Sequence, residues 1–383
     1  MHRKPICAAL AIISAATLTT SLAYGMTAVE LPAGAPADKP VGKLEQVQAF
    51  YDAMPTGVTV TETGRIFVNF PRWGDKVPFT VGEVRDGKVV AYPDLAVNHE
   101  NPKDPGDGLI SVQSVVADGK GRVWLLDTAA PEFAAPRPQG AKLVAVDLAT
   151  NKIVKRLVFP DNVILPSTYV NDMRFDFRKG SQGTVYVTDS SVSGPGAIIV
   201  MDIASGHAVR RLSGAKATSA DPAFVPVVEG VPVLGDGPDG TRKPVHVAAD
   251  GIALSADGKT LYFSPLSSRH LYSVATELLN DSAVNEQQLA AAFRTWVKRA
   301  LPMVLRLMQT ALCMRATTST MPYASACRTA SGRQSLTIRA CCGLIPCRSV
   351  RTATCISSST SCTVRPVSIR ATTNVKNRTA CCV

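Results

Sequence analysis

The chain has no cysteine between Cys7 and Cys313, although ten cysteines occur among its 383 residues. The other nine lie from Cys313 to Cys382, whereas a secreted fold held by disulfides distributes its cysteines through the core. This C-terminal segment also contains no histidine, and its cysteine spacings repeat no Cys-x-x-Cys pattern. The cluster "RACCGLIPC" (339–347) therefore indicates neither a disulfide framework nor a zinc site.

Acidic residues are absent from residues 301–383, which hold eleven of the 41 lysines and arginines. All 30 aspartates and glutamates lie in the first 300 residues, together with 30 basic residues. The formal net charge of +11 thus belongs to the C-terminal segment alone. The balanced charge of the remainder argues against a nucleic-acid partner.

Three catalytic sequence motifs are missing. The chain has no Gly-x-Ser-x-Gly elbow, no Walker loop and no dinucleotide-binding fingerprint. Serine hydrolases of the elbow type, P-loop NTPases and Rossmann oxidoreductases therefore have no support.

The N-terminus has the layout of a secretory signal peptide. "MHRKPICAALAIISAATLTTSLAYG" (1–25) begins with basic residues, continues with an apolar run and ends in small residues. Serine and threonine interrupt the run, which favours a cleaved signal over a retained membrane anchor. We expect a protein exported to the periplasm or the extracellular space, with no stable membrane anchor and with its propeller domain over residues 26–300.

A strand-and-turn repeat runs through this domain. "TETGRIFVNF" (61–70), "ADGKGRVWLLD" (117–127) and "RKGSQGTVYVTD" (178–189) each place an aromatic residue three positions after a turn glycine, and "SADGKTLYFS" (255–264) repeats the layout with one extra residue. Glycine turns followed by β-branched and aromatic residues are typical of hairpins.

A second repeat relates "KLVAVDLATNKIVKRL" (142–157) to "AIIVMDIASGHAVRRL" (197–212), with Asp147 and Asp202 in equivalent turns. Units that recur every 50 to 60 residues favour an all-β, six-bladed β-propeller over the alternative of a β-sandwich. The segment 276–299 departs from this pattern. Its apolar residues have near-helical spacing, and Asn280-Asp281-Ser282 interrupts it, so we expect a short helical insertion.

Several motifs in a fixed order resemble a known family. "IFVNFPRW" (66–73), "SVQSVVADGKGRVWLLDT" (111–128), "LPSTYVNDMRFD" (165–176), "YVTDSS" (186–191) and "ADGIALSADGKTLYFSPLSSRHLYSV" (249–274) are similar to the bacterial branch of the major royal jelly protein/yellow family. The resemblance covers about residues 45 to 298. It implies a secreted six-bladed propeller with a small-molecule site at a central channel. The insect members of this family include proteins that bind amines and enzymes that convert dopachrome. The family also resembles gluconolactonase-type propellers, which hold a divalent metal in the channel.

The segment 301–383 fits a reading frame displaced by one base. In that frame, the last base of Met303 with the first two of Val304 encodes glycine, and Cys341-Cys342 encodes leucine. The shifted reading permits another turn-and-strand repeat and a family-like "LWPDTL". We therefore predict a frame-shifted, disordered segment that replaces the last blade and leaves the propeller incomplete. A genuine basic tail is the alternative.

Polar residues at the starts of inner strands are the candidate site residues, because inner strands of several blades converge there. We predict that Gln113, Asn171, Asp172 and Asp250 line a ligand channel. Asn171 and Asp250 are also predicted ligands of a divalent metal such as Ca²⁺, which prefers oxygen donors. The same residue types form ordinary turns, so both interpretations stay open at this stage.

Other candidates are Asp127 and Asp189, which are more typical of turns, and Pro71-Arg72-Trp73, which could form a channel rim or a surface pair in which the arginine stacks on the tryptophan. His270 is a candidate general base or a structural strand-end histidine.

Three functions remain open from the sequence, which leaves undecided whether the protein is an enzyme. The first is a secreted propeller that binds a small organic ligand. The second is a metal-dependent lactonase that uses a metal-bound water as the nucleophile. The third is an exported structural protein without a ligand.

Overall fold

The computed structural model describes residues 46–298, apart from 229, 237 and 238, together with five short strands beyond residue 300. The chain divides into two units, Met1–Lys39 and Pro40–Val383, and all described residues lie in the second. The predicted signal peptide and most of the segment 301–383 lie outside the described residues. No helix in the described part of the chain is long and apolar enough to cross a membrane.

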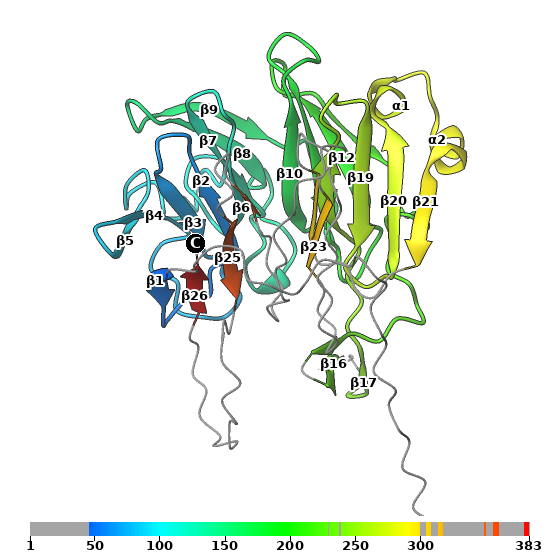
Figure 1. The fold of residues 1–383 in the computed structure, drawn as a ribbon, viewed down its shortest axis with the longest axis horizontal. Coiled ribbons are helices and arrows are strands. Elements are labelled where there is room, and N and C mark those ends of the chain that lie inside the picture. The colour runs from blue at the N-terminus through cyan, green and yellow to red at the C-terminus, as the bar shows by residue number, and fades with distance from the viewer. Residues whose placement is uncertain are drawn as a thin grey trace, which may run out of the picture. The chain divides into compact units, whose positions relative to one another are not determined.

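Four antiparallel sheets of four strands follow one another along the chain (Figure 1). The first contains β2 (Gly57–Val60), β3 (Ile66–Asn69), β4 (Val81–Arg85) and β5 (Lys88–Ala91). The second contains β6 (Val112–Ala117), β7 (Arg122–Asp127), β8 (Lys142–Asp147) and β9 (Ile153–Val158). The third contains β10 (Val170–Asp176), β11 (Thr184–Asp189), β12 (Ala197–Asp202) and β13 (Ala208–Arg211). The fourth contains β18 (Ala249–Leu254), β19 (Thr260–Pro265), β20 (His270–Ala275) and β21 (Arg294–Lys298).

The first strands of successive sheets are neighbours, in the order β2, β6, β10 and β18. Strand β18 in turn contacts β22 (Val304–Leu307), which pairs with β23 (Cys313–Ala316) in a two-stranded sheet. A further sheet has the order β1-β26-β25-β24, formed by β1 (Gln46–Phe50), β26 (Thr379–Cys382), β25 (Cys355–Ser359) and β24 (Arg348–Ser349). The chain is an all-β propeller, as the repeats predicted.

The repeat glycines occupy the turns between the first two strands of their sheets. Gly121 and Gly183 have φ angles of 79° and 107°, a region that L side chains rarely adopt. The glycine therefore permits the tight reversal, and the apolar run after it forms the second, buried strand of the sheet.

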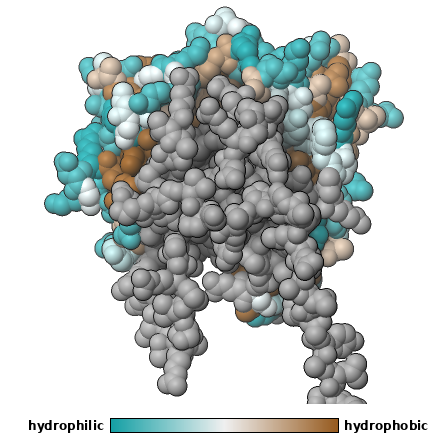
Figure 2. All heavy atoms as spheres, viewed as in Figure 1, coloured by the Kyte–Doolittle hydropathy of each residue, from teal (hydrophilic) through white to brown (hydrophobic). Residues whose placement is uncertain are grey.

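The core lies between neighbouring sheets and follows from the two-residue period of the strands. In β7, Trp124 and Leu126 face the third sheet, where they pack in one cluster with Met173 and Val185. The alternate residues of β7 face the first sheet and pack in another cluster around Phe67. A third cluster joins the third and fourth sheets. On the face seen in Figure 2, hydrophobic residues of the described part of the chain form separate areas among polar ones.

The predicted helical insertion consists of α1 (Thr276–Asn280) and α2 (Glu286–Ala292). Helix α1 ends before Asp281, within the predicted interruption, and Asn285 caps α2 through a capping box with Gln288. The helical pattern does not continue to residue 299. Residues 294–298, "RTWVK", form β21 instead, because they pair with β20 and are rich in β-branched and aromatic side chains.

Between β13 and β18 the chain forms two small hairpins. The first joins β14 (Val227–Val228) to β15 (Val231–Pro232), and the second joins β16 (Leu234–Asp236) to β17 (Arg242–Pro244). A one-turn 3-10 helix, η1 (Pro131–Phe133), lies between β7 and β8.

Candidate functional site

All four predicted channel residues lie at β-bulges near the start of inner strands. The register of β6 with β7 shifts between Val112 and Ser114, at Gln113. The register of β10 with β11 shifts across Asn171 and Asp172, and that of β18 with β19 shifts at Asp250. Bulges redirect side chains out of the sheet ladder and are frequent next to active sites. The first sheet lacks such a shift, since β2 and β3 pair without interruption.

Hydrogen bonds connect these positions across three sheets. Gln113 Nε2 donates to Asn171 Oδ1 at 2.9 Å, and Ser114 Oγ donates to Asp172 Oδ1 at 2.9 Å. Thr188 Oγ1 accepts from the Asp172 N–H at 3.3 Å and donates to the Asp250 carbonyl at 2.9 Å. The structure thus brings the four predicted residues into one contiguous group. We call Gln113, Asn171, Asp172, Thr188, Ser190 and Asp250 the inner-strand cluster.

The two aspartates of the cluster differ in their partners. Asp172 is buried and forms an ion pair with Arg174, whose guanidinium nitrogen lies 2.8 Å from Asp172 Oδ2. Asp250 is half-buried, and the nearest side-chain donor to its carboxylate among the described residues is Ser190 Oγ, at 3.5 Å. Burial, together with the negative charge of Asp172, raises the pKa of Asp250 to about 7. Asp250 is therefore a carboxyl that can exchange a proton near neutral pH.

An aromatic group adjoins the cluster on the side of Gln113. Tyr169 donates its hydroxyl hydrogen to Gln113 Oε1 at 2.9 Å and accepts from Trp73 Nε1 at 2.6 Å. The ring of Phe133 stacks on Trp73, with centroids 5.3 Å apart, and lies 4.8 Å from the Tyr169 ring. Phe133 is 46% exposed and has a φ of 58°.

The sequence pointed to Trp73 as a rim residue but missed Tyr169 and Phe133. The position of Tyr169 directly before "VND" was the available signal. Its partner Trp73 is remote in the sequence, so the pairing could not be anticipated.

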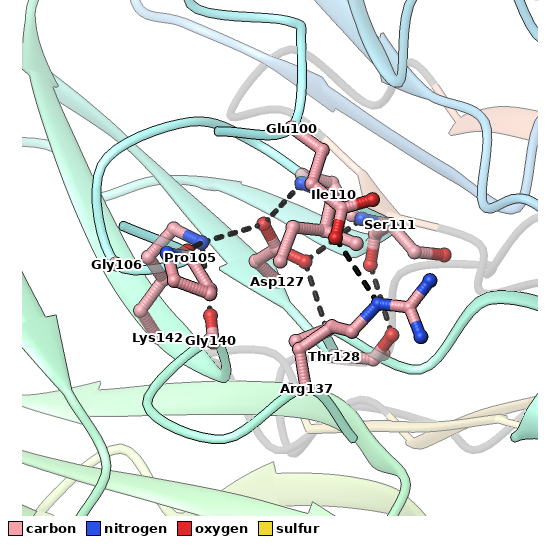
Figure 3. Close-up of polar contacts among 12 residues, drawn as sticks. Glu100, Pro105, Gly106, Ile110, Ser111, Asp127, Thr128, Arg137, Gly140 and Lys142 are labelled. Carbon is pink, nitrogen blue, oxygen red and sulfur yellow. Dashed lines mark hydrogen bonds and ion pairs between the residues drawn. The ribbon is translucent and has the colours of Figure 1, made fainter. Parts of the chain in front are cut away.

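Asp127 and Asp189 have structural roles, the more typical of the two interpretations. Asp127 accepts from the backbone N–H groups of Ile110 and Ser111, just before β6, and its carboxylate lies 3.1 Å from Lys142 Nζ (Figure 3). Lys142 also donates to the carbonyls of Pro105 and Gly140, both at 2.9 Å. Asp127 and Lys142 are completely buried. Together they fix the segment that leads into Gln113.

Asp189 repeats this arrangement in the third sheet. It accepts from the N–H of Tyr169, just before β10, and pairs with Arg210 at 2.8 Å. Each aspartate ends the second strand of its sheet and anchors the start of the first strand, where a bulge carries the polar residues of the cluster.

His270 lies outside this network. Its ring is near Ser268 and Tyr272 of its own hairpin. These contacts match a strand-end structural histidine.

A groove of about 410 Å³ lies elsewhere, beside β12, β13 and α1. None of the four predicted residues lines it. Its most buried cation, Arg211, already donates to the carbonyl of Leu279 in α1 and to that of Val284 in the loop between α1 and α2. The groove therefore offers no uncommitted buried charge for a ligand.

Most oxygen atoms of the cluster that could bind a metal already accept hydrogen bonds. Asn171 Oδ1 accepts from Gln113, and both Asp172 oxygens accept hydrogen bonds, from Ser114 and Arg174. Only Asp250 keeps an uncommitted carboxylate, whereas Ca²⁺ takes six to eight oxygen ligands. Among the described residues no group of three or more histidine, cysteine, aspartate or glutamate side chains could hold a metal ion. The described residues alone thus supply few uncommitted oxygen ligands for Ca²⁺, and the predicted metal site stays a prediction.

Comparison with known proteins decides the family. The model of the family described as "Major royal jelly protein" matches residues 110–313, more than half of the chain. The chain belongs to the major royal jelly protein family. The matched residues include β6 to β21 and thus all four predicted site residues.

Several curated relatives share this similarity. The L-dopachrome tautomerase yellow-f of Drosophila melanogaster is 34% identical over 124 residues, which cover 30% of this chain and 28% of the relative. The protein yellow of Drosophila madeirensis is 27% identical over 270 residues, which cover 63% of this chain and 43% of the relative. The chain thus spans less than half the length of these relatives.

Among solved structures, a gluconolactonase from Xanthomonas campestris is similar, with a TM-score of 0.46 and 12% identity over 82% of this chain and 85% of that chain. Regucalcin from Agrobacterium tumefaciens has a TM-score of 0.41 and 11% identity over 76% of each chain.

Proposed function

We propose that this member of the major royal jelly protein family binds a small organic ligand at the inner-strand cluster. One observation carries the proposal. Three neighbouring inner strands each bulge at a polar residue, and hydrogen bonds join these residues into one group. A bulge interrupts the ladder and leaves an unpaired residue, so its recurrence at three equivalent positions favours a binding function over strand stability alone.

The charges of the cluster favour a ligand with a cationic or proton-donating group. Asp250 has a carboxylate with one long contact, and the Asp172 carboxylate adds negative charge beside it. Arg174 offsets the charge of Asp172 through their ion pair, but no cation pairs with Asp250 among the described residues. A ligand cation near Asp250 would supply the missing charge.

Calorimetric titration with dopamine tests this proposal, because dopamine carries an ammonium group and a ring with hydroxyl groups. We expect binding to the full chain, and a loss of at least ten-fold in affinity for Asp250→Asn. The matched control is Asp257→Asn, which alters an exposed turn in the same sheet, where Asp257 binds Ser255. Equal affinity in the two variants would refute the role of Asp250.

A second candidate function is proton transfer on the bound ligand. The pKa of Asp250, raised to about 7 by burial and by Asp172, suits a group that accepts and returns a proton at neutral pH. One relative carries the name L-dopachrome tautomerase, and tautomerisation is such a proton transfer. The loss of dopachrome's visible absorbance, measured against pH, tests this function. A rate that is the same with wild type, with Asp250→Asn and without protein would exclude it.

The metal-dependent lactonase remains the alternative from the sequence. Metal analysis of the purified protein separates it from ligand binding. Stoichiometric Ca²⁺ that is lost in Asp250→Ala would favour the lactonase. A folded protein without bound metal that still binds dopamine would favour the binding protein.

Export is part of the proposal and rests on residues 1–25, whose basic start, apolar run and small residues match a signal peptide. Mass spectrometry of the protein from its native host tests it. A mature N-terminus near Met26 is the expected result, and retention of residues 1–25 would contradict export by cleavage.

A further inference from the structure

A chain of hydrogen bonds runs from the aromatic group into the inner-strand cluster. It joins Trp73 to Tyr169 at 2.6 Å, Tyr169 to Gln113 at 2.9 Å and Gln113 to Asn171 at 2.9 Å. These residues come from three sheets or from the loops that join their strands. We call these four residues the relay.

Tryptophan sets the direction of the relay. The indole Nε1 is only a donor, so the hydrogen between Trp73 and Tyr169 belongs to Trp73 and the tyrosine oxygen accepts it. Burial raises the pKa of Tyr169, so the phenol keeps its own proton at neutral pH. The phenol donates this proton to Gln113 Oε1, at 2.9 Å.

The amide groups then have one consistent orientation. Gln113 accepts at Oε1, so its Nε2 faces Asn171 and donates to Asn171 Oδ1. The Asn171 amino group is left at the far end of the relay. Among the described residues, none accepts a hydrogen bond from Asn171 Nδ2. This nitrogen is also not one of the fully buried polar atoms that lack a hydrogen-bond partner.

We infer that the relay fixes Asn171 as a hydrogen-bond donor, so that the inner-strand cluster selects ligands that present an acceptor oxygen at this position. The inference rests on the proposed function, since it specifies the ligand chemistry of the same site. Trp73 and Tyr169 act as positioning residues, because they orient Asn171 through Gln113. The reversed asparagine would present an oxygen, which suits a metal ion or a ligand donor.

The orientation can be observed without any ligand. Neutron diffraction from crystals of the deuterated full chain locates deuterium atoms and so distinguishes Nδ2 from Oδ1. We expect both side-chain deuterons of Asn171 on the atom that faces away from Gln113, and one deuteron of Gln113 pointing at Asn171. Deuterons on the Asn171 atom nearest Gln113 would overturn the inference, whatever the protein binds.

The selectivity is tested with two probes of similar size, 1-indanone, which has a carbonyl acceptor, and indole, which has an N–H donor. In calorimetric titrations we expect 1-indanone to bind about ten-fold more tightly, because indole would leave the Asn171 amino group without a partner. Tyr169→Phe breaks the relay and should bring the ratio of the two affinities close to one. A general loss of structure would weaken both probes together and leave the ratio unchanged.

Tyr186→Phe is the matched control, because Tyr186 is also buried and its hydroxyl accepts a hydrogen bond from Asn280, at 2.6 Å. This variant should keep the ten-fold ratio. Equal affinity of the wild type for both probes would overturn the selectivity and leave the proposed function in place. The expected orientation without binding of either probe at millimolar concentration would overturn the selectivity, whereas the titration with dopamine decides separately on the proposed site.

Discussion

Replacement of Lys142 by methionine should destabilise the second sheet strongly, because the change leaves Asp127 buried without its cation. Lys142 Nζ lies 2.9 Å from two carbonyl oxygens and 3.1 Å from Asp127 Oδ2, and both charged side chains are completely buried. Removal of one member of a buried ion pair costs about 3–5 kcal/mol. Methionine nearly matches lysine in length, so little cavity forms.

The cost should fall near the lower limit of this range. The Asp127 carboxylate keeps hydrogen bonds from the N–H groups of Ile110, Ser111 and Ala129, at 2.7 to 2.9 Å, and these still compensate much of its charge. We therefore expect a loss of about 3 kcal/mol in the free energy of unfolding.

Urea unfolding measures this loss, with the fluorescence of Trp124 as the reporter, since Trp124 is buried in β7, the strand that pairs with β8 and its Lys142. A loss of this size lowers the urea midpoint by about 1 M or more. Lys155→Met, in the neighbouring strand β9, is the control. Lys155 donates to the Gln182 side chain at the surface, so this variant should change stability by less than about 1 kcal/mol. A Lys142→Met variant no more destabilised than Lys155→Met would show that the buried pair contributes no such stability.

Three further predictions concern pH, packing and the C-terminal segment. Burial and the negative charge of Asp172 raise the pKa of Asp250 from 3.8 to about 7. The folded protein therefore has its full stability below pH 4, where this carboxyl is protonated, and loses stability as the pH rises to 7. In urea unfolding, the stability of Asp250→Asn relative to wild type should increase by about 1.4 kcal/mol per pH unit over this window. A stability difference that does not change with pH would contradict the raised pKa. Gly196→Ala should lower stability by about 2 kcal/mol or more, because its Cβ would lie 2.2 Å from the Thr218 carbonyl oxygen. In the control Gly235→Ala, the Cβ meets a methyl group at 3.3 Å, so this variant should unfold at almost the wild-type temperature. A gene whose reading frame is restored after codon 300 should yield a protein that resists protease longer than this chain, and equal lifetimes would count against the frame displacement.

The strand-and-turn repeat carried most of the information about the fold. Its glycine turns and alternating apolar residues, as in β7, depend on local backbone geometry and on a two-residue period, both of which are visible in the sequence. The helical insertion was placed correctly at its start but not at its end. Whether residues 294–298 form a helix or a strand depends on pairing with β20, a tertiary interaction that the helical spacing of Trp296 does not reveal.

The candidate site was predictable as a set of residues but not as an arrangement. Polar residues at strand starts identified Gln113, Asn171 and Asp250. The bulges were not predictable, because a bulge is a property of the register between two strands. The relay was equally hidden, since its direction depends on contact between Trp73 and Tyr169. Whether Asn171 presents an oxygen or an amino group follows from that contact.

The central claim is that the inner-strand cluster is the ligand site, and a crystal structure of the full chain with dopamine tests it most directly. We expect ligand density with an oxygen within hydrogen-bond distance of Asn171 Nδ2 and the ammonium group beside the Asp250 carboxylate. Ligand density in the groove beside β12, β13 and α1, with the cluster unoccupied at saturating dopamine, would contradict it.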